Sequence, residues 1–344
     1  MAVQGSGVTT LIDVLSQLDP SGKQMKIAEV LAKQNEVLSD MHWEEGNKST
    51  GHMAGMRTVK PTPSFRALNS GVPVTKSGST TIEETCSLLE DFSQVDRELA
   101  IMAGDVNGFR LKEAKPHMDG MSDKMATTLF YGNSNSNPLE YTGFAARYAT
   151  KNTATSLSGA NVIDAGGTGA NLRSVYLVGW GPSTVFGIYP KNTKGGLSHE
   201  DVTNASGESG DGFPKASVLL DASGNQYMGF RDHWLWRCGL FVQDWRYVVR
   251  IANINMATIL RDESTGPILE DLFIQAAEQI ESLTGVNPAF YAPREIRTYF
   301  RRQIAARKAK NMSWTEIGGQ RVLMFDEIPV RRTDALNVAE TQVV

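Results

Sequence analysis

Residues 43–80 lack the large apolar side chains that a stretch of this length needs in order to fold by itself. They include five Gly and three Pro among many Ser, Thr and Asn. Short extended pieces are recognisable at residues 56–61 and 71–78. The stretch therefore predicts a two-stranded excursion without a core of its own. Long insertions of this kind are usually functional, and a disordered surface loop is the alternative.

An amphipathic segment precedes this excursion. Its apolar residues fall near a 3.6-residue period, which predicts a helix with one apolar face; they are Ile27, Val30, Leu31, Val37, Leu38 and Met41. Nothing N-terminal to the segment is large enough to cover that face. We therefore expect it to pack on a distant part of the chain or on another chain.

Two helices are predicted after the excursion. A strand that starts at Thr80 runs into the first helix, which ends near Gly104 and carries a seam of Leu88, Phe92, Val95, Leu99 and Met102. The second helix, at about 109–131, presents one apolar face made of Met118, Met121, Met125 and Leu129. Pro116 and Gly120 should bend or weaken its first half.

Turn residues and alternating patterns divide the remainder of the chain. The expected elements are a turn cluster at 131–138, a short amphipathic piece at 139–149, a linker at 150–172, a strand pair at 174–180 and 184–190, consecutive strands at 227–254, helices at 267–285 and 293–310, and a last strand at 320–332. No internal repeat is evident.

The composition excludes several classes of protein. The 344 residues include 34 Lys and Arg against 38 Asp and Glu, and 41% of them are hydrophobic. A sizeable core is therefore expected, and a surface built throughout to clamp a polyanion is excluded. We find neither a secretory signal nor a membrane-spanning stretch. Cys86 and Cys238 cannot form a disulfide framework or a zinc site, and we expect buried, reduced thiols in a protein made in the cytoplasm.

The sequence offers no convincing catalytic constellation. His199, Glu200 and Asp201 are adjacent in a Gly- and Ser-rich region, whereas metal or acid–base chemistry needs side chains that converge. The glycine-rich segment 165–171 lacks the lysine of a phosphate-binding loop and does not lead from a strand into a helix. No G-x-S-x-G elbow is present. We therefore expect no catalytic, cofactor-binding or metal-binding residue, and no enzyme.

Two charged or aromatic segments remain to be explained. The predicted helix at 293–310 has Glu295 as its only acidic residue and seven basic ones: Arg294, Arg297, Arg301, Arg302, Arg307, Lys308 and Lys310. Such a helix favours an anionic partner, either carboxylates of a neighbour or phosphates, although a solvated face is at least as good an interpretation. Trp234, Trp236 and Trp245 lie among His233, Arg237 and Arg246, and a buried sheet face is favoured there over a ligand platform.

An unpartnered arm, a coreless excursion and the lack of catalytic residues together indicate a subunit that assembles by exchanging segments with its copies. Five stretches strengthen this interpretation, at 31–52, 65–73, 125–148, 239–254 and 325–336. Through them the chain resembles the major capsid proteins of tailed bacteriophages with the Hong Kong 97 fold, and among those the shell proteins of epsilon-fifteen-like short-tailed phages. The strings at 129–133 and 244–254 are the most specific.

The resemblance implies an α+β fold with four parts: an N-terminal arm (1–42), an E-loop (43–90), a P-domain (91–150) with a spine helix at about 108–132, and an A-domain (151–344) with returning P-domain strands. Pro116 and Gly120 depart from an uninterrupted spine helix, which suggests a kink or a late start. Lys60 and Lys76 lie in the E-loop, but by themselves they are weak evidence for the isopeptide cross-link of some relatives.

The resemblance also implies a function. Hexamers and pentamers of the chain would form the icosahedral shell of a virion around double-stranded DNA. Expected partners are the chain itself, a cement or decoration protein, a portal, a separate scaffolding protein and, without sequence specificity, the packaged DNA; a membrane is not expected. The alternatives are an encapsulin-like cellular compartment and, from another class, a monomeric β-rich hydrolase or binding module.

Overall fold

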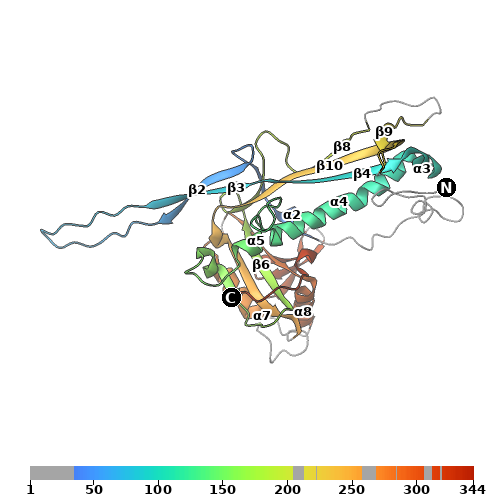
Figure 1. Ribbon diagram of the computed structural model, residues 1–344. Helices are drawn as coiled ribbons and strands as arrows, with labels where there is room; N and C mark the ends of the chain where they lie inside the picture. The colour runs from blue at the N-terminus through green and yellow to red at the C-terminus, as the bar shows by residue number, and fades with distance from the viewer. Residues whose placement is uncertain are drawn as a thin grey trace. The chain divides into compact units, whose positions relative to one another are not determined.

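The computed structural model describes residues 35–203, 213–221, 223–257, 269–283, 285–305, 312–317 and 320–344. Within these limits the chain divides into two compact units of mixed helices and strands (Figure 1). The first unit comprises Leu88–Met125 and Gly196–Arg237, and the second comprises Gln34–Ser87, Ala126–Gly195 and Cys238–Val344. The predicted arm at 1–42 lies outside the described residues up to residue 34, and its described end contains the short helix α2 (Val37–Asp40).

The first unit is built around one long strand, with which shorter strands pair in antiparallel orientation. The strands β8 (Leu197–Asp201) and β9 (Ser217–Leu220) both pair with β10 (Gln226–Val242). The strand β4 (Ser87–Asp96) is the other neighbour of β10 in the sheet, and along the chain β4 leads into α3 (Arg97–Met102). A small core joins the strands to the helices and consists of Val95, Ala100, Ala103, Val106, Phe109, Ala216 and Phe230.

The prediction of a helix through Leu88 to Met102 is wrong in its first half. Residues 87–96 form the strand β4, and only Arg97–Met102 are helical. Asp96 marks the change, because its side chain accepts a hydrogen bond from the backbone N–H of Glu98 and so caps the new helix. The four-residue step from Leu88 to Phe92 fits one face of a strand as well as one face of a helix, and the neighbouring strand β10 decides the outcome.

The predicted helix at 109–131 is confirmed as the single helix α4 (Val106–Tyr131). Pro116 lies inside it without ending it, although proline removes one hydrogen bond of the helix ladder. The expected late start is therefore wrong, because the helix begins at Val106 and continues through Pro116. The apolar face is confirmed, because Met121, Met125 and Leu129 are buried and Met118 is half-buried.

The second unit contains a large mixed sheet with helices packed on it. Its strands follow the order β13 (Met312–Ile317), β14 (Gln320–Phe325), β15 (Ile328–Arg332), β12 (Asn287–Ala292), β6 (Leu172–Trp180) and β7 (Val185–Tyr189). Further pairings attach β11 (Val248–Asn255) to β6, β5 (Val162–Asp164) to β11, and β1 (Trp43–Glu45) to β7. All residues of β6 are buried, as expected for a central strand.

The main core of this unit lies between the sheet and two helices, α7 (Leu269–Gln279) and α8 (Arg294–Ala305). Phe273 of α7 stacks on Phe290 of β12 with ring centroids 4.4 Å apart, and its ring meets that of Phe300 of α8 edge-on at 4.8 Å. These three rings are at most 1% exposed, so they contribute strongly to the burial that holds α7 and α8 on the sheet.

Several predictions for this unit are confirmed and others are corrected. The consecutive strands expected at 227–254 are present as β10 and β11, separated by the short helix η2 (Trp245–Tyr247). The strand expected at 320–332 is two strands, β14 and β15, because Asp326 takes a positive φ of 49° and reverses the chain. The linker expected at 150–172 contains the helix η1 (Leu157–Asn161) and the strand β5.

The remaining elements match their predictions in type and differ in extent. The short piece at 139–149 contains α5 (Phe144–Arg147). The strands β6 and β7 appear where a strand pair was expected, but they meet only at Trp180 and Val185, in parallel orientation. The helix expected at 267–285 is described as α7, and Gly285 beyond it has a φ of +80°. A short helix η3 (Asp334–Leu336) follows β15.

The excursion is a two-stranded hairpin that projects from the rest of the second unit (Figure 1). The strands β2 (Gly51–Val59) and β3 (Gly78–Thr85) pair antiparallel from Gly51 with Thr85 to Val59 with Gly78. Residues 60–77 join them without regular structure, and every one of these residues is exposed. The prediction of a two-stranded excursion without its own core is therefore confirmed.

Candidate functional site

The adjacent residues His199, Glu200 and Asp201 lie on β8, and two of them, His199 and Asp201, contact charged side chains of neighbouring elements. The Nε2 atom of His199 is 3.0 Å from Oδ1 of Asp232, and the Nη2 atom of Arg110 is 2.9 Å from Oδ2 of Asp201. Arg110 also donates to Oδ1 of Asp232 at 2.7 Å. Within the described ranges, no group of three or more His, Cys, Asp or Glu side chains is placed to hold a metal ion.

The glycine-rich segment 165–171 connects β5 to β6, so a strand follows it and not a helix. Its setting therefore differs from the strand-to-helix turn in which phosphate-binding loops occur. Gly166 and Gly169 have positive φ angles of 77° and 105°. The backbone N–H of Gly167 donates to the carbonyl oxygen of Asn253 at 2.9 Å, which ties the segment to the end of β11. The segment is a structural connection.

The aromatic strand residues form core. Trp234 and Trp236 are 1% and 9% exposed, which confirms the buried face expected for them. The Trp234 ring stacks with the ring of His117 at 5.1 Å and with that of His199 at 5.3 Å, so no open face remains for a ligand. Trp245 lies apart from this strand in η2 and is half-buried.

The two cysteines are free thiols, as expected. Cys238 is buried and Cys86 is half-buried. Burial raises the pKa of Cys86 to about 11 and that of Cys238 to about 12. Because the thiolate is the reactive form, neither residue is an activated nucleophile. No helix in the described part of the chain is long and apolar enough to cross a membrane.

The base of the hairpin is fixed to the second unit by polar and apolar contacts. The Nζ atom of Lys48 is 2.7 Å from Oε1 of Glu83. Arg147 lies 2.5 Å from Oε1 of Glu84, and both side chains are largely buried. Ala54, Ile82 and Cys86 pack against the buried cluster of Phe186, Ile188 and Phe241. The hairpin therefore leaves the body of the unit from a firm attachment.

Gly51 is required at this base. A Cβ atom on Gly51 would lie 1.9 Å from the backbone oxygen of Glu84, which is closer than any real side chain allows. The two strands of the hairpin therefore meet at a position that only glycine can occupy.

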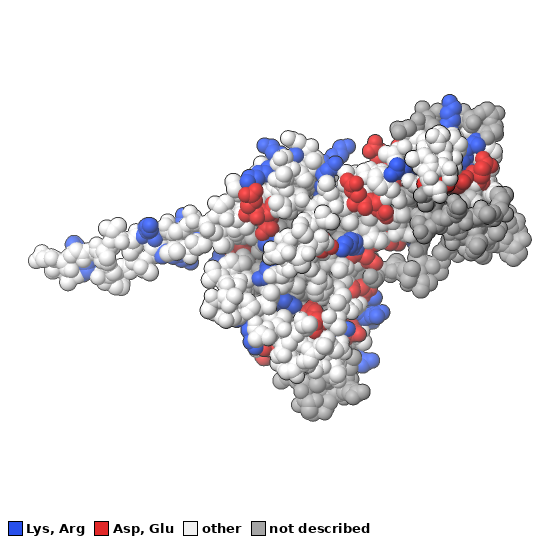
Figure 2. Space-filling view, in the orientation of Figure 1, with Lys and Arg blue, Asp and Glu red and all other residues white. Residues whose placement is uncertain are grey.

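The distal part of the hairpin combines positive charge with exposed apolar side chains. From residue 46 to residue 82 there is no Asp or Glu, whereas Arg57, Lys60, Arg66 and Lys76 lie near or beyond the paired strands. Figure 2 shows blue groups and no red ones along this projection. The side chains of Phe65, Leu68 and Val74 are 108%, 93% and 100% exposed. Three large apolar side chains are thus fully exposed on one projecting loop, which suits contact with another surface.

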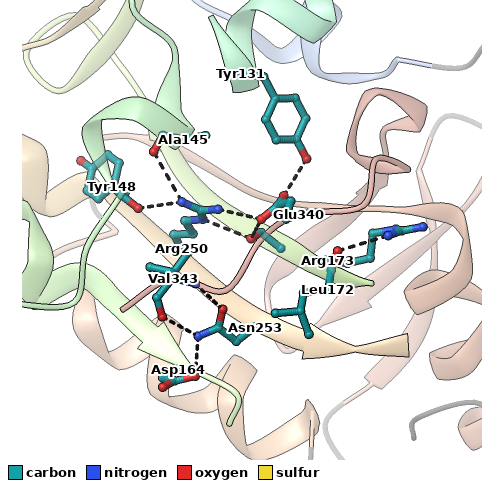
Figure 3. Close-up of polar contacts among 11 residues, drawn as sticks. Tyr131, Ala145, Tyr148, Asp164, Leu172, Arg173, Arg250, Asn253, Glu340 and Val343 are labelled. Carbon is teal, nitrogen blue, oxygen red and sulfur yellow. Dashed lines mark hydrogen bonds and ion pairs between the residues drawn. The ribbon is translucent and has the colours of Figure 1, made fainter. Parts of the chain in front are cut away.

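A buried ion pair anchors the C-terminal segment (Figure 3). The Nη2 atom of Arg250 on β11 lies 2.6 Å from Oε2 of Glu340, and the two side chains are 5% and 7% exposed. Glu340 also accepts hydrogen bonds from Ser174 Oγ at 2.5 Å and Tyr131 OH at 2.6 Å. Arg250 donates from Nη1 to the carbonyl oxygen of Tyr148 at 2.7 Å. Although burial opposes its charge, Tyr176 and Glu340 together raise the pKa of Arg250.

Asn253 extends this network at the end of β11. Its φ of 60° places the residue in the left-handed region. Its Nδ2 atom donates to Asp164 Oδ1 and to the carbonyl oxygen of Val343, both at 2.8 Å, and its Oδ1 atom accepts from the Val343 N–H at 2.8 Å (Figure 3). These side chains pair their donors and acceptors with one another, which gives the network a structural role in holding the C-terminal segment.

The basic helix is present as α8, but its last three basic residues, Arg307, Lys308 and Lys310, lie outside the described residues. Arg297 faces Glu36 of the N-terminal segment, with Nη1 3.5 Å from Oε1. Glu295 lies 3.7 Å from Nε of Arg173. Arg294, Arg301 and Arg302 form no ion pair among the described residues. Part of the predicted positive surface is therefore compensated inside the chain and part of it is open.

Sequence reasoning missed the Arg250–Glu340 pair and the one-sign charge of the hairpin. The pair joins residues 90 positions apart, and no local pattern indicates such a contact. The hairpin charge was readable, because the absence of acidic residues over 46–82 is visible in the sequence itself.

Comparison with known proteins follows this geometry. The model of a family described as "Major capsid protein GP7" matches residues 19–344. A chain from the structure of bacteriophage epsilon15, derived from cryo-electron microscopy and modelling, is 28% identical, with a TM-score of 0.74 over 100% of this chain and 99% of that chain. No curated protein sequence matches.

Two solved structures with lower sequence identity also match. The capsid of bacteriophage JBD30 matches with a TM-score of 0.50 and 12% identity, over 94% of this chain and 98% of that chain. The encapsulin SrpI of Synechococcus elongatus matches with a TM-score of 0.39 and 11% identity, over 69% of this chain and 95% of that chain. The α+β fold of phage capsid proteins, of the Hong Kong 97 type, is thereby confirmed.

Proposed function

Since this chain belongs to the family of major capsid protein GP7, we propose that its copies form hexamers and pentamers that close into an icosahedral shell around double-stranded DNA. The chain is a head-shell protein of a phage and resides in the capsid of the virion. The observation that carries the proposal is the similarity to the epsilon15 chain along the whole of both chains. The family assignment favours a phage shell over an encapsulin-like compartment and over a monomeric hydrolase or binding module.

The described parts of the chain support an assignment of roles. We assign residues 43–90 to the E-loop, because they contain the projecting hairpin of β2 and β3. Residues 91–150 are assigned to the P-domain, with α4 as the spine helix. Residues 151–344 are assigned to the A-domain together with strands that return to the P-domain, and residues 1–42 to the N-terminal arm.

The hairpin supports assembly through its exposed side chains. A monomer that leaves Phe65, Leu68 and Val74 fully in water has no use for them in its own core. Covering each of them by a neighbouring copy would contribute about 1.5–3 kcal/mol. In a symmetric assembly the same contact would be repeated at every copy, so its contribution would recur around each capsomer.

The proposed shell function also implies other partner molecules and a role without catalysis. We expect a cement or decoration protein over the hairpins, a portal, a separate scaffolding protein, and contact with DNA that does not depend on base sequence. We also propose that the chain is not an enzyme. The supporting observation is that its candidate residues, such as His199 and Asp201, are engaged in structural ion pairs.

Electron microscopy of the expressed full chain tests the proposal. Negative staining should show closed particles or rings, and a chain without residues 1–42 should give soluble subunits that form no closed shells. Circular dichroism of both proteins controls for folding. Normal particles from the shortened chain would remove the role of the arm, and a full-length chain that stays monomeric at every concentration would refute the assembly proposal.

A further inference from the structure

An open hollow of about 490 Å³ lies on the second unit between α8 and the strands β13 and β14. Five side chains line it: Arg297, Arg301, Ile304, Trp314 and Arg321. The guanidinium carbon of Arg301 lies 5.5 Å from the ring centroid of Trp314, so the two side chains stack in a cation–π contact. Three arginines therefore converge on one recess that has an apolar wall.

The positive charge around this hollow is only partly compensated. Arg331 is paired with Asp40 at 3.1 Å and Arg332 with Asp334 at 2.8 Å. Arg297 has the longer contact to Glu36, and its buried Nε atom has no hydrogen-bond partner. Arg301 and Arg321 are exposed and form no ion pair within the described ranges. The hollow thus presents unpaired guanidinium groups to the outside.

The surroundings of Arg297 disfavour its positive charge. Burial together with the charges of Arg301, Arg332 and Arg331 lowers the pKa of Arg297, and Glu36 offsets only part of this effect. A carboxylate inserted beside Arg301 and Arg321 would relieve the repulsion, and arginine forks bind carboxylates in bidentate geometry. The ligand class that fits is a protein carboxylate.

The same sheet carries an acidic turn, opposite in charge to the arginines of the hollow, at some distance from them. Asp326 and Glu327 form the turn between β14 and β15, both are exposed, and neither forms an ion pair among the described residues. Arg321 lies at the start of β14 and the turn at its end. At about 3.3 Å per residue the two groups are separated by roughly 17 Å and lie toward opposite ends of the strand.

This arrangement suits a ring of identical copies. A heterologous contact uses two different, complementary surfaces of the same subunit, and it closes when the rotation between copies does. We propose that the hollow formed by Arg297, Arg301 and Arg321 receives the Asp326–Glu327 turn of a second copy of this chain. This inference rests on the proposed assembly function and names a contact within it.

Nucleic acid is the less favoured occupant. A duplex presents one negative charge per about 1.7 Å of its axis and is met by basic residues spread along it. The hollow instead gathers its guanidinium groups in a recess walled by Ile304 and Trp314. A recess of this kind accommodates one inserted loop, and the exposed two-residue turn has the required charge.

Paired charge reversal tests the contact. The variants are R301E/R321E in the hollow, D326R/E327R in the turn, and the combination of all four. Each reversal alone should weaken association by about tenfold or more, measured as shell yield at fixed subunit concentration, and the combination should restore it. The matched control is R302E, which removes an unpaired arginine of the same helix that does not line the hollow. Thermal melting of the unassembled subunits, and the neutral variant R301Q, separate lost assembly from lost folding.

Each outcome decides between alternatives. A wild-type shell yield from R301E/R321E would overturn the inference. It would also be overturned if R301E/R321E and D326R/E327R each fold but form fewer shells, and the four-residue combination does not restore the shell yield. Normal shells that hold less DNA would assign the hollow to phosphate and overturn it as well. If the wild-type chain forms no particles, the proposed function and this contact both fall, whereas loss confined to the reversal variants leaves the function intact.

Discussion

The exposed tip of the hairpin provides the sharpest prediction for assembly. Replacing Phe65, Leu68 and Val74 by Ser removes three side chains that are 108%, 93% and 100% exposed in the subunit. Because they contribute nothing to the core of the subunit, its free energy of unfolding should change by no more than about 0.5 kcal/mol. If a neighbouring copy covers all three, the shell loses about 5–9 kcal/mol for each subunit.

A loss of this size changes association strongly. At its lower limit it corresponds to more than a thousandfold weaker association. Sedimentation velocity against subunit concentration measures this effect, and denaturant melts measure the stability of the free subunit. The control is L139S, which removes a side chain that is 81% exposed outside the hairpin. Triple-variant shells that form at the wild-type concentration would show that the tip is not covered on assembly.

Four further predictions concern the buried ion pair, the two thiols and the base of the hairpin. The variant E340Q leaves the buried Arg250 without its counter-charge, and the free energy of unfolding should fall by about 3–5 kcal/mol in chemical denaturation. Since burial raises the pKa values of Cys86 and Cys238 to about 11 and about 12, both thiols should react slowly with a disulfide reagent at pH 8 and fully after unfolding; rapid reaction of the native protein would contradict this environment. Stability should also fall as the pH rises above 9, because the unfolded thiols ionise first and the folded ones retain their protons. The variant G51A should destabilise the base of the hairpin, seen as faster amide exchange in β2 and β3, and unchanged exchange rates would argue against the close contact with the strand opposite.

Periodicity predicted those elements whose pattern has one interpretation. The methionine face of α4 could be read because Met118, Met121 and Met125 recur at helical spacing over several turns. The hairpin was predictable from what it lacks, since a long segment without apolar residues cannot form a core. Resemblance then supplied the fold class and the assembly function, which periodicity alone does not give.

The secondary-structure predictions were wrong at positions where the neighbouring residues along the chain do not determine the conformation. Leu88 and Phe92 are 63% and 41% exposed on one face of β4, and their even spacing suits a strand and a helix equally. The seam therefore predicts a helix when the pairing with β10 is left out of account. The last strand was expected as one piece because the turn at Asp326 carries no glycine, although a positive φ is needed there.

Contacts between distant segments could not be predicted at all. Glu340 reaches Ser174 and Arg250 across the sheet, and only the tertiary fold brings these three side chains together. For the arginines of α8 the sequence allows an anionic partner and a solvated face equally. Which of them have found one inside the chain depends on Glu36, which is far away in the sequence.

The sequence of the projecting hairpin also disfavours aggregation of subunits that are not yet part of a shell. A two-stranded ribbon has two free edges, and free edges invite pairing between molecules. Lys60, Arg66 and Lys76, with no acidic residue nearby, make two such ribbons repel each other, while the prolines at 61, 63 and 73 remove backbone donors from the loop. Aggregates of identical ribbons are thereby discouraged in the pool of free subunits, and a ribbon remains available for a partner surface of a different kind.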